Sequence, residues 1–279
     1  MGTHEDGAMD HRRGPGPRAR GIAALALALL AVALAPRLPA SAAGSLPYAA
    51  LGDSYSAGIG SGREDGTDCR RSANAYPPLL STASDRYVLT DFAACSGATI
   101  AGVTDLQLAA IAPARLVTVT VGGNDAGFGE IITDCLRPGS GCRRDFPDED
   151  RRIDSLAGPL HALYLRIVAT APAASLDVLT YPQIFRAQQS TCPATWTFTP
   201  QDVTWFRSEY THMNAVIRRA AAGVPRTRVV DVETAFAGHE VCTVQPWAYG
   251  GRLGDPYSSF HPNTLGHAAL AALVRRVTG

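Results

Sequence analysis

The chain has 279 residues, of which 46% are apolar, and its 25 basic residues balance 25 acidic ones. A formal net charge of zero gives no electrostatic case for nucleic-acid binding, and the length suits one sizeable α/β domain. All of the basic residues are arginine, so the sequence excludes any mechanism that needs a lysine nucleophile or base.

The first segment has the pattern of a secretory signal peptide. An arginine-rich region precedes an uncharged apolar run over residues 21–35, and Ala40–Ala42 fits a small-residue cleavage site. The apolar run is shorter than the roughly 20 residues that a membrane span needs. We therefore predict that residues 1–42 are a signal peptide and that residues 43–279 form one secreted domain with no stable membrane span. Retention at the cell surface by an uncleaved anchor is the alternative.

Short apolar runs alternate with helical patterns over the rest of the chain. The runs lack polar alternation, as is typical of parallel strands that are buried on both faces. We expect strands over Tyr48–Leu51, Tyr87–Phe92, Leu116–Val121, Leu176–Thr180 and Arg228–Val232.

Three helical patterns are strong. Residues 150–169 place apolar side chains at helical spacing, although Gly158-Pro159 should kink or split the helix. Thr199 is a typical N-cap for a second helix, and the last helix runs from about Thr264 to Arg276. The alternation predicts a three-layer α/β/α sandwich around a parallel sheet of about five strands. Ligands of such sheets bind beyond the carboxyl ends of the strands.

Two predicted strands end at residues suited to acyl chemistry. Ser54, in LGDSYSAG, lies just past the first strand and therefore at the carboxyl edge of the sheet. Asn124, in GGND, follows the strand over Leu116–Val121, where its amide can donate to a developing oxyanion. Taken alone, each segment is also a common turn, and for GGND the turn is the more frequent reading.

Weaker signals come from two other segments. Gly97, in Ser96-Gly97, follows the strand over Tyr87–Phe92, and His261, in FHPN, directly precedes the last helix on a loop that can reach the sheet edge. His161, His212 and His267 fall within helical patterns. A metal pair of His261 and His267 would need further ligands at matching spacing, and none is evident.

Six cysteines follow the predicted cleavage site. An even number in a secreted chain indicates disulfide bonds, and six cysteines allow 15 pairings that spacing alone cannot choose between. Cys135 and Cys142 flank a Pro/Gly turn, so a bridge between them is easy to close. No C-x-x-C pair is present, which disfavours a zinc site.

The four segments together resemble the SGNH/GDSL hydrolase superfamily. GDSYSAG, Ser96-Gly97, GGND and FHPN occur in the order of the family between residues 52 and 263. Residues 69–77, CRRSANAYP, are similar to a segment of the secreted actinomycete esterase/lipase branch. The resemblance implies a flavodoxin-like sheet, hydrolysis of carboxylic esters, no metal and no other cofactor.

The resemblance also implies a role for each matching residue. Ser54 is the expected nucleophile and His261 the expected general base. The N–H groups of Ser54 and Gly97 and the side chain of Asn124 are the expected oxyanion hole. Disulfide bonds are implied in sequential order, Cys69–Cys95, Cys135–Cys142 and Cys192–Cys242.

One position departs from the family pattern. Many members carry an acid three residues before the histidine, where this chain has Ser258. A base histidine needs a group that fixes its tautomer. Asp255 can bend back to His261 through Pro256, or a backbone carbonyl near Ser258 can accept the Nδ1–H and give a Ser-His dyad. We favour the carbonyl, because some relatives work as dyads.

The expected substrates are extracellular esters, either small molecules or lipids, and the expected state is a monomer. A carbohydrate O-acetylesterase on the same fold is the alternative. A non-catalytic binding protein is disfavoured, because the expected catalytic set is complete. Aromatic residues such as Phe198, Trp205, Tyr257 and Phe260 can line an acyl pocket, but for any single one the core is the better expectation.

Overall fold

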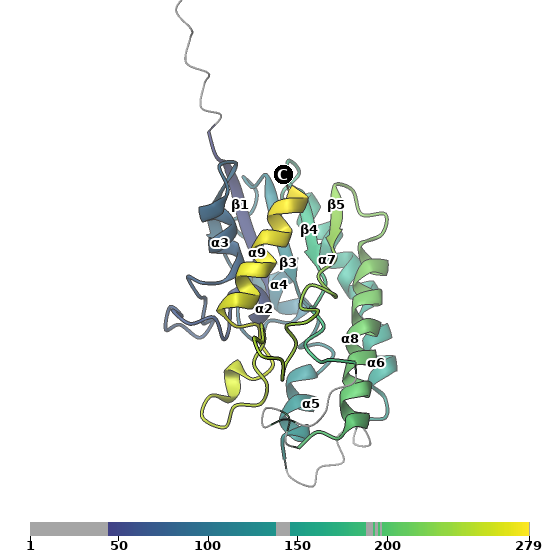
Figure 1. Ribbon diagram of the computed structural model, residues 1–279. Coiled ribbons are helices and arrows are strands. Elements are labelled where there is room, and N and C mark those ends of the chain that lie inside the picture. The colour runs from purple at the N-terminus through teal and green to yellow at the C-terminus, as the bar shows by residue number, and fades with distance from the viewer. Residues whose placement is uncertain (1–43, 138–145, 188–191, 193–194, 196, 279) are drawn as a thin grey trace, which may run out of the picture. The chain divides into compact units, whose positions relative to one another are not determined.

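Five parallel strands form the centre of the structure, a computed structural model that describes residues 44–137, 146–187, 192, 195 and 197–278 (Figure 1). The strands are β1 Leu46–Gly52, β2 Tyr87–Phe92, β3 Leu116–Thr120, β4 Ser175–Leu179 and β5 Thr227–Val230. Their order in the sheet is β2-β1-β3-β4-β5, with every neighbouring pair parallel. This is the flavodoxin-like order, and it confirms the predicted fold class. The predicted signal peptide lies outside the described residues.

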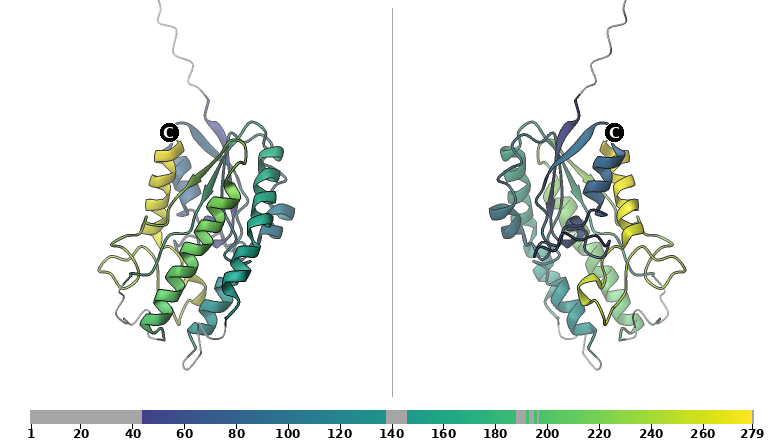
Figure 2. Two further views of the ribbon diagram at one scale, coloured as in Figure 1. Left: turned by 90° about the vertical axis from the view of Figure 1, so that its right-hand side faces the viewer. Right: turned by 90° about the vertical axis from the view of Figure 1, so that its left-hand side faces the viewer.

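Helices cover both faces of the sheet. They are α2 Ser54–Ala57, α3 Tyr76–Ala83, α4 Ile100–Leu106, α5 Phe128–Cys135, α6 Glu149–Ser155, α7 Ala157–Thr170, α8 Pro200–Ala221 and α9 Thr264–Thr278, with a short 3₁₀ helix, η3, at Pro256–Ser258. Helices α3 and α9 pack together on one face, α4 and α7 lie on the other, and α8 packs beside α7 (Figure 2). No helix among the described residues is long and apolar enough to span a membrane.

The strands are apolar because the sheet lies between these two helix layers. Every residue of β3 is buried, and so are the last five residues of β1. Burial of this apolar surface is the main force that holds the three layers together. Since parallel strands all point the same way, the segments that follow β1, β2, β3 and β4 meet at one edge of the sheet.

The pattern over residues 150–169 is two helices rather than one. The break falls at Leu156, just before Gly158-Pro159. Proline has no N–H and is tolerated in the first turn of a helix, so Pro159 lies near the start of α7 instead of inside a longer helix. At α8 the predicted N-cap is present. The Thr199 hydroxyl accepts the N–H of Asp202 at 3.2 Å, and the Asp202 carboxylate accepts the N–H of Thr199 at 2.8 Å.

Two of the three implied disulfide bonds are present. Cys69 is bonded to Cys95, which follows β2, and Cys192 is bonded to Cys242. Cys142, the expected partner of Cys135, lies outside the described residues. The Cys69–Cys95 bond ties the long loop before α3 to the segment that carries Gly97.

Candidate active site

Ser54 lies at the carboxyl end of β1, in the short helix α2. Gly52, the last residue of β1, has a φ of +125°, and a Cβ there would lie 2.2 Å from the carbonyl oxygen of Thr120, so only glycine fits. The buried side chain of Gln107 holds the same residue. It accepts the Gly52 N–H at 2.7 Å and donates to the Gly52 carbonyl at 2.9 Å. These contacts fix the backbone that carries Ser54 out of the sheet.

His261 reaches Ser54 from the loop between η3 and α9. Its Nε2 lies 2.7 Å from the Oγ of Ser54, and its Nδ1 donates to the carbonyl oxygen of Ser259 at 2.9 Å. Burial lowers the pKa of His261 to about 4, and the hydrogen bond to Ser259 opposes this shift only in part. The ring is therefore neutral at pH 7, with its proton on Nδ1 and its Nε2 lone pair toward the serine hydroxyl.

The hydrogen bonds of Asp255 go to groups other than His261. Its carboxylate accepts the N–H of Ser258 at 3.4 Å and lies 3.6 Å from the guanidinium of Arg252. Hydrogen bonding from Ser258 is the largest cause that lowers the pKa of Asp255. Of the two groups that the sequence offered to orient His261, the structure brings a backbone carbonyl to Nδ1.

The loops that carry Gly97 and Asn124 are tied to each other. The side-chain amide of Asn124 donates to the carbonyl of Ala98 at 2.9 Å. In the opposite direction, the N–H of Ile100 donates to the carboxylate of Asp125 at 3.0 Å. Gly97 has a φ of +78°, a backbone conformation that favours glycine. The structure thus holds the two predicted oxyanion residues at a fixed separation.

A cavity of about 490 Å³ opens beside Ser54. Its lining includes all four residues of the expected catalytic set, Ser54, Gly97, Asn124 and His261. An apolar group completes much of the lining: Phe128, Ile132, Leu136, Tyr210, Tyr257 and Phe260. The volume is that of a pocket for a small ligand or one acyl chain. Two of the aromatic candidates therefore line the cavity, whereas Phe198 belongs to the core.

A buried polar network behind Ser54 was not predicted. The hydroxyl of Tyr181 donates to the Asp53 carboxylate at 2.5 Å and accepts the N–H of Gly123 at 3.0 Å. Asp53 is only 2% exposed, and burial raises its pKa to about 7. The network joins the turn after β1 to the turn after β3, so it positions Ser54 and Asn124 relative to each other. The sequence could have indicated this contact, because Tyr181 follows β4 and so lies at the same sheet edge as Asp53.

Comparison with known proteins decides the family. The model of the GDSL-like Lipase/Acylhydrolase family matches residues 50–269. The chain belongs to this family. Membership makes it a carboxylic ester hydrolase of the lipase/acylhydrolase type. Lipase 1 of Streptomyces coelicolor is 36% identical over 235 residues, which cover 82% of this chain and 84% of that protein.

Two solved structures of similar proteins show the same architecture. They are the extracellular lipase of Streptomyces rimosus and phospholipase A1 of Streptomyces albidoflavus. Each superimposes with a TM-score of 0.76 at 33% identity, over 84% of this chain and 99% of the other. The GDSL-type chain described here therefore resembles secreted Streptomyces lipases in both sequence and fold.

One group of side chains suited to bind a metal ion occurs elsewhere among the described residues. It consists of Asp150, Glu209 and His212, on α6 and α8. None of the three lines the cavity beside Ser54.

Proposed function

We propose that this GDSL hydrolase cleaves carboxylic esters through an acyl-enzyme on Ser54. The 2.7 Å contact between His261 Nε2 and Ser54 Oγ carries the proposal. As Oγ attacks the ester carbonyl carbon, Nε2 takes its proton, and the imidazolium then gives that proton to the leaving alcohol. In the second half-reaction the same nitrogen takes a proton from water as the water attacks the acyl carbon. The bond from Oγ to that carbon then breaks, the imidazolium returns the proton to Oγ, and the acid is released.

His261 works in this proposal as one half of a Ser-His dyad. A general base needs a partner that fixes its tautomer and stabilises the imidazolium. The carbonyl of Ser259, 2.9 Å from Nδ1, supplies the acceptor. Asp255 is engaged with Ser258 and Arg252, so we give it no direct part in the reaction.

The oxyanion hole of this proposal consists of the N–H groups of Ser54 and Gly97 and the amide of Asn124. An amide nitrogen carries two hydrogens, so the bond from Asn124 to Ala98 orients the side chain and leaves one hydrogen for the oxyanion. The presence of all three residues in one cavity lining supports the assignment. Donors of this kind stabilise the tetrahedral intermediate more than the ground state.

We further propose lipid-like esters with an apolar acyl chain as the substrates. The apolar part of the cavity lining, which includes Phe128, Ile132 and Leu136, supports this, and similar proteins are named as lipases and a phospholipase A1. An acetyl group would leave that surface unfilled. We therefore expect hydrolysis of p-nitrophenyl octanoate to exceed release of acetate from acetylated xylan, and the reverse order would favour the carbohydrate esterase.

Residues 1–42 are, in our proposal, removed on export, and residues 43–279 act outside the cell. The disulfide bonds and the similarity to an extracellular lipase support this. N-terminal sequencing of protein from the culture medium of a secreting host should begin at or near Ala43. A full-length chain recovered only with the membrane fraction would contradict it.

Replacement of the nucleophile tests the mechanism. Ser54→Ala should lower kcat by at least about 10³-fold, as removal of a serine nucleophile does in other hydrolases. Ser56 provides a matched control on the same short helix. It is buried, and its hydroxyl lies 3.2 Å from that of Tyr76. We expect Ser56→Ala to keep kcat within about threefold of the wild type, because its hydroxyl only stabilises packing. An equal loss in both variants would remove the case for Ser54.

A further inference from the structure

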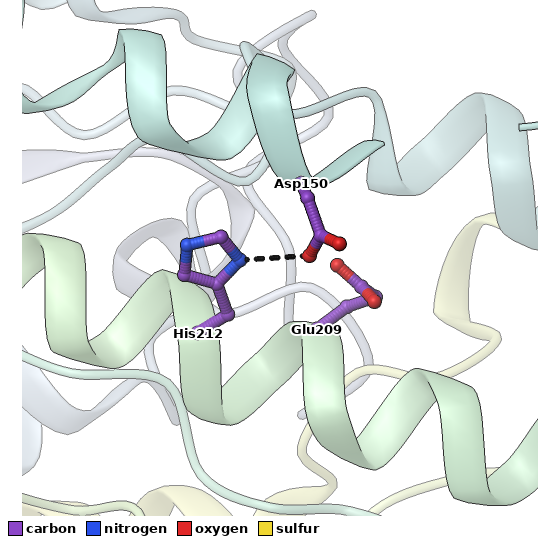
Figure 3. Close-up of side chains that lie close together, drawn as sticks. All are labelled: Asp150, Glu209 and His212. Carbon is purple, nitrogen blue, oxygen red and sulfur yellow. Dashed lines mark hydrogen bonds and ion pairs between the residues drawn. The ribbon is translucent and has the colours of Figure 1, made fainter. Parts of the chain in front are cut away.

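Three side chains that can bind a metal ion meet between α6 and α8 (Figure 3). Asp150 comes from α6, whereas Glu209 and His212 lie three residues apart on α8. Residues at this spacing lie on the same face of a helix, here the face toward α6. One ligand atom from each of the three lies within 4.8 Å of the others.

Glu209 is buried without full hydrogen bonding. Its side chain is 4% exposed, and its Oε2 has no hydrogen-bond partner among the described residues. Figure 3 shows its carboxylate turned toward Asp150. A buried carboxylate oxygen is normally satisfied by a hydrogen bond, an ion pair or a metal ion, because its desolvation is otherwise unfavourable. The unsatisfied oxygen is therefore open to one further partner, such as a cation.

Glu149, next to Asp150 on α6, is also buried with an unsatisfied carboxylate oxygen. It is 4% exposed, and its Oε1 also lacks a partner among the described residues. Two buried acids on facing helices thus each keep an oxygen that can bind a cation, and a cation shared between the helices would stabilise the packing of α6 on α8.

His212 has the orientation of a metal-binding histidine. Its Nε2 lies 3.0 Å from a carboxylate oxygen of Asp154, and its Nδ1 lies 3.1 Å from a carboxylate oxygen of Asp150. A histidine that binds a metal usually donates its other ring N–H to a carboxylate, which fixes the tautomer. Donation of Nε2–H to Asp154 would leave Nδ1 as the metal-binding nitrogen. A metal ion would then replace the proton that Nδ1 shares with Asp150 in this structure.

We propose that Asp150, Glu209 and His212 bind one divalent transition-metal ion, with Zn²⁺ the best match. One imidazole and two carboxylates suit Zn²⁺, whereas Ca²⁺ takes about six to eight oxygen ligands. Zinc bonds of about 2.0–2.2 Å place neighbouring ligand atoms about 3–4 Å apart. Asp150 and His212 already lie at such a separation, and the exposed side chain of Asp150 can rotate to meet Glu209.

The site is structural, although it adjoins the ester cavity. Tyr210 directly follows Glu209, lines that cavity and stacks on Phe128 with ring centroids 5.2 Å apart. A metal that joins α6 to α8 would thus stabilise one wall of the acyl pocket without touching Ser54. Its effect is expected on unfolding rather than on the chemical step, so its test is independent of the proposed mechanism.

Thermal unfolding with and without Zn²⁺ tests the site. The secreted protein is treated with a chelator, dialysed and melted alone, with Zn²⁺ or with Ca²⁺. At one hundred times Kd, Zn²⁺ should raise Tm by about 5–10 °C, and titration calorimetry should give one Zn²⁺ per chain. Calcium should shift Tm by less than about 1 °C, since the site offers too few oxygens. No shift with Zn²⁺, or a larger shift with Ca²⁺, would overturn the proposal.

Variants distinguish this site from adventitious zinc binding. Asp150→Asn and His212→Gln should each abolish the Zn²⁺-dependent shift. Asp150 is exposed, so its variant should fold without difficulty. The matched variants Asp105→Asn, on the surface of α4, and His161→Gln, on α7, should keep the full shift. A Zn²⁺ shift that survives in Asp150→Asn and His212→Gln would place the metal elsewhere and overturn the proposal.

Discussion

Two histidines of this chain each lie between two oxygen atoms, and the kind of oxygen gives them different chemistry. At the sheet edge, His261 donates to the carbonyl of Ser259 and faces the hydroxyl of Ser54, and both of these groups are neutral. Between α6 and α8, His212 faces two carboxylates, those of Asp150 and Asp154. Neutral partners leave an uncharged imidazole at His261 that can take a proton. The carboxylates beside His212 are ligand groups that can share a metal ion with the ring.

The buried acidic residues of these two regions differ in how fully their carboxylates are hydrogen-bonded. Asp53 accepts the N–H of Tyr55 and the hydroxyl of Tyr181, so hydrogen bonds replace the water it lost. Glu149 and Glu209 each keep an oxygen without a partner among the described residues. A polar network that is satisfied internally stays rigid and can position a catalytic group, whereas an unsatisfied one gains from an added ion.

The largest expected departure from ordinary histidine behaviour concerns the pH dependence at the sheet edge. A histidine with the usual pKa near 6.5 would lose about 100-fold in kcat/KM at pH 4.5, because the protonated ring is no base. Burial disfavours the charged ring and lowers the pKa of His261 to about 4. The neutral form therefore persists, and kcat/KM should fall less than about twofold between pH 7 and 4.5.

This profile is measured with p-nitrophenyl butyrate, and tryptophan fluorescence at each pH checks that the protein stays folded. Burial raises the pKa of Asp53 behind Ser54 to about 7, so the profile is also measured in Asp53→Asn. An inflection near pH 6.5 that occurs in both folded proteins would show that His261 resembles a solvent-exposed histidine. Such a result would mean that burial among neutral partners does not set the chemistry of His261 apart from that of His212.

Loss of the Tyr181 hydroxyl should leave unsatisfied polar atoms behind Ser54, as there are between α6 and α8. Tyr181→Phe removes the hydroxyl that Asp53 and Gly123 share, and it leaves one carboxylate oxygen of Asp53 and the N–H of Gly123 without this partner. The free energy of unfolding should fall by about 1–3 kcal/mol in urea denaturation. Tyr257→Phe is the control, because Tyr257 is 68% exposed and its change should be below about 0.5 kcal/mol. Equal stability of the two variants would mean that Asp53 does not depend on Tyr181.

Replacement of the buried acid Glu209, between α6 and α8, should instead raise the free energy of unfolding. Glu209→Gln replaces an unsatisfied buried carboxylate with a neutral group of similar volume. In metal-free protein at pH 8 it should raise the free energy of unfolding by about 1 kcal/mol, since removing a buried charge removes its desolvation penalty. Glu130→Gln, at an exposed position on α5, should leave stability unchanged. A loss of stability in Glu209→Gln would show that the carboxylate is already satisfied.

The smallest effect is expected at Asp255. Because its carboxylate binds Ser258 and Arg252, Asp255→Asn should keep kcat within about threefold of the wild type on p-nitrophenyl butyrate. A loss of about 10³-fold or more would instead indicate a catalytic triad.

Most of the fold was predictable because the central strands are short apolar runs between turn and helix signals. Each of the five predicted strands is present, with ends that differ by a few residues. Helices α2, α3, α4 and α5 were not predicted. They have four to eight residues, too few for a clear periodic pattern. Helix α3 begins Tyr76-Pro77-Pro78, where the prolines are tolerated because they fall in the first turn.

The candidate catalytic residues were predictable because the segments after parallel strands share one edge. The sequence favoured a backbone carbonyl near Ser258 as the group that orients His261, but it could not single out the carbonyl of Ser259, because any residue supplies such a main-chain group. The α6–α8 cluster was also missed. Asp150 and His212 each read as ordinary helix residues, and only the packing of the two helices brings their side chains together.

The most direct test is to trap the nucleophile. The secreted protein is treated with a fluorophosphonate, which phosphonylates a serine activated by a neighbouring base, and its peptides are mapped by mass spectrometry. We expect one adduct, on Ser54, that abolishes ester hydrolysis, and no adduct in Ser54→Ala or His261→Ala. An adduct on Ser56, or full inactivation without modification of Ser54, would contradict the mechanism.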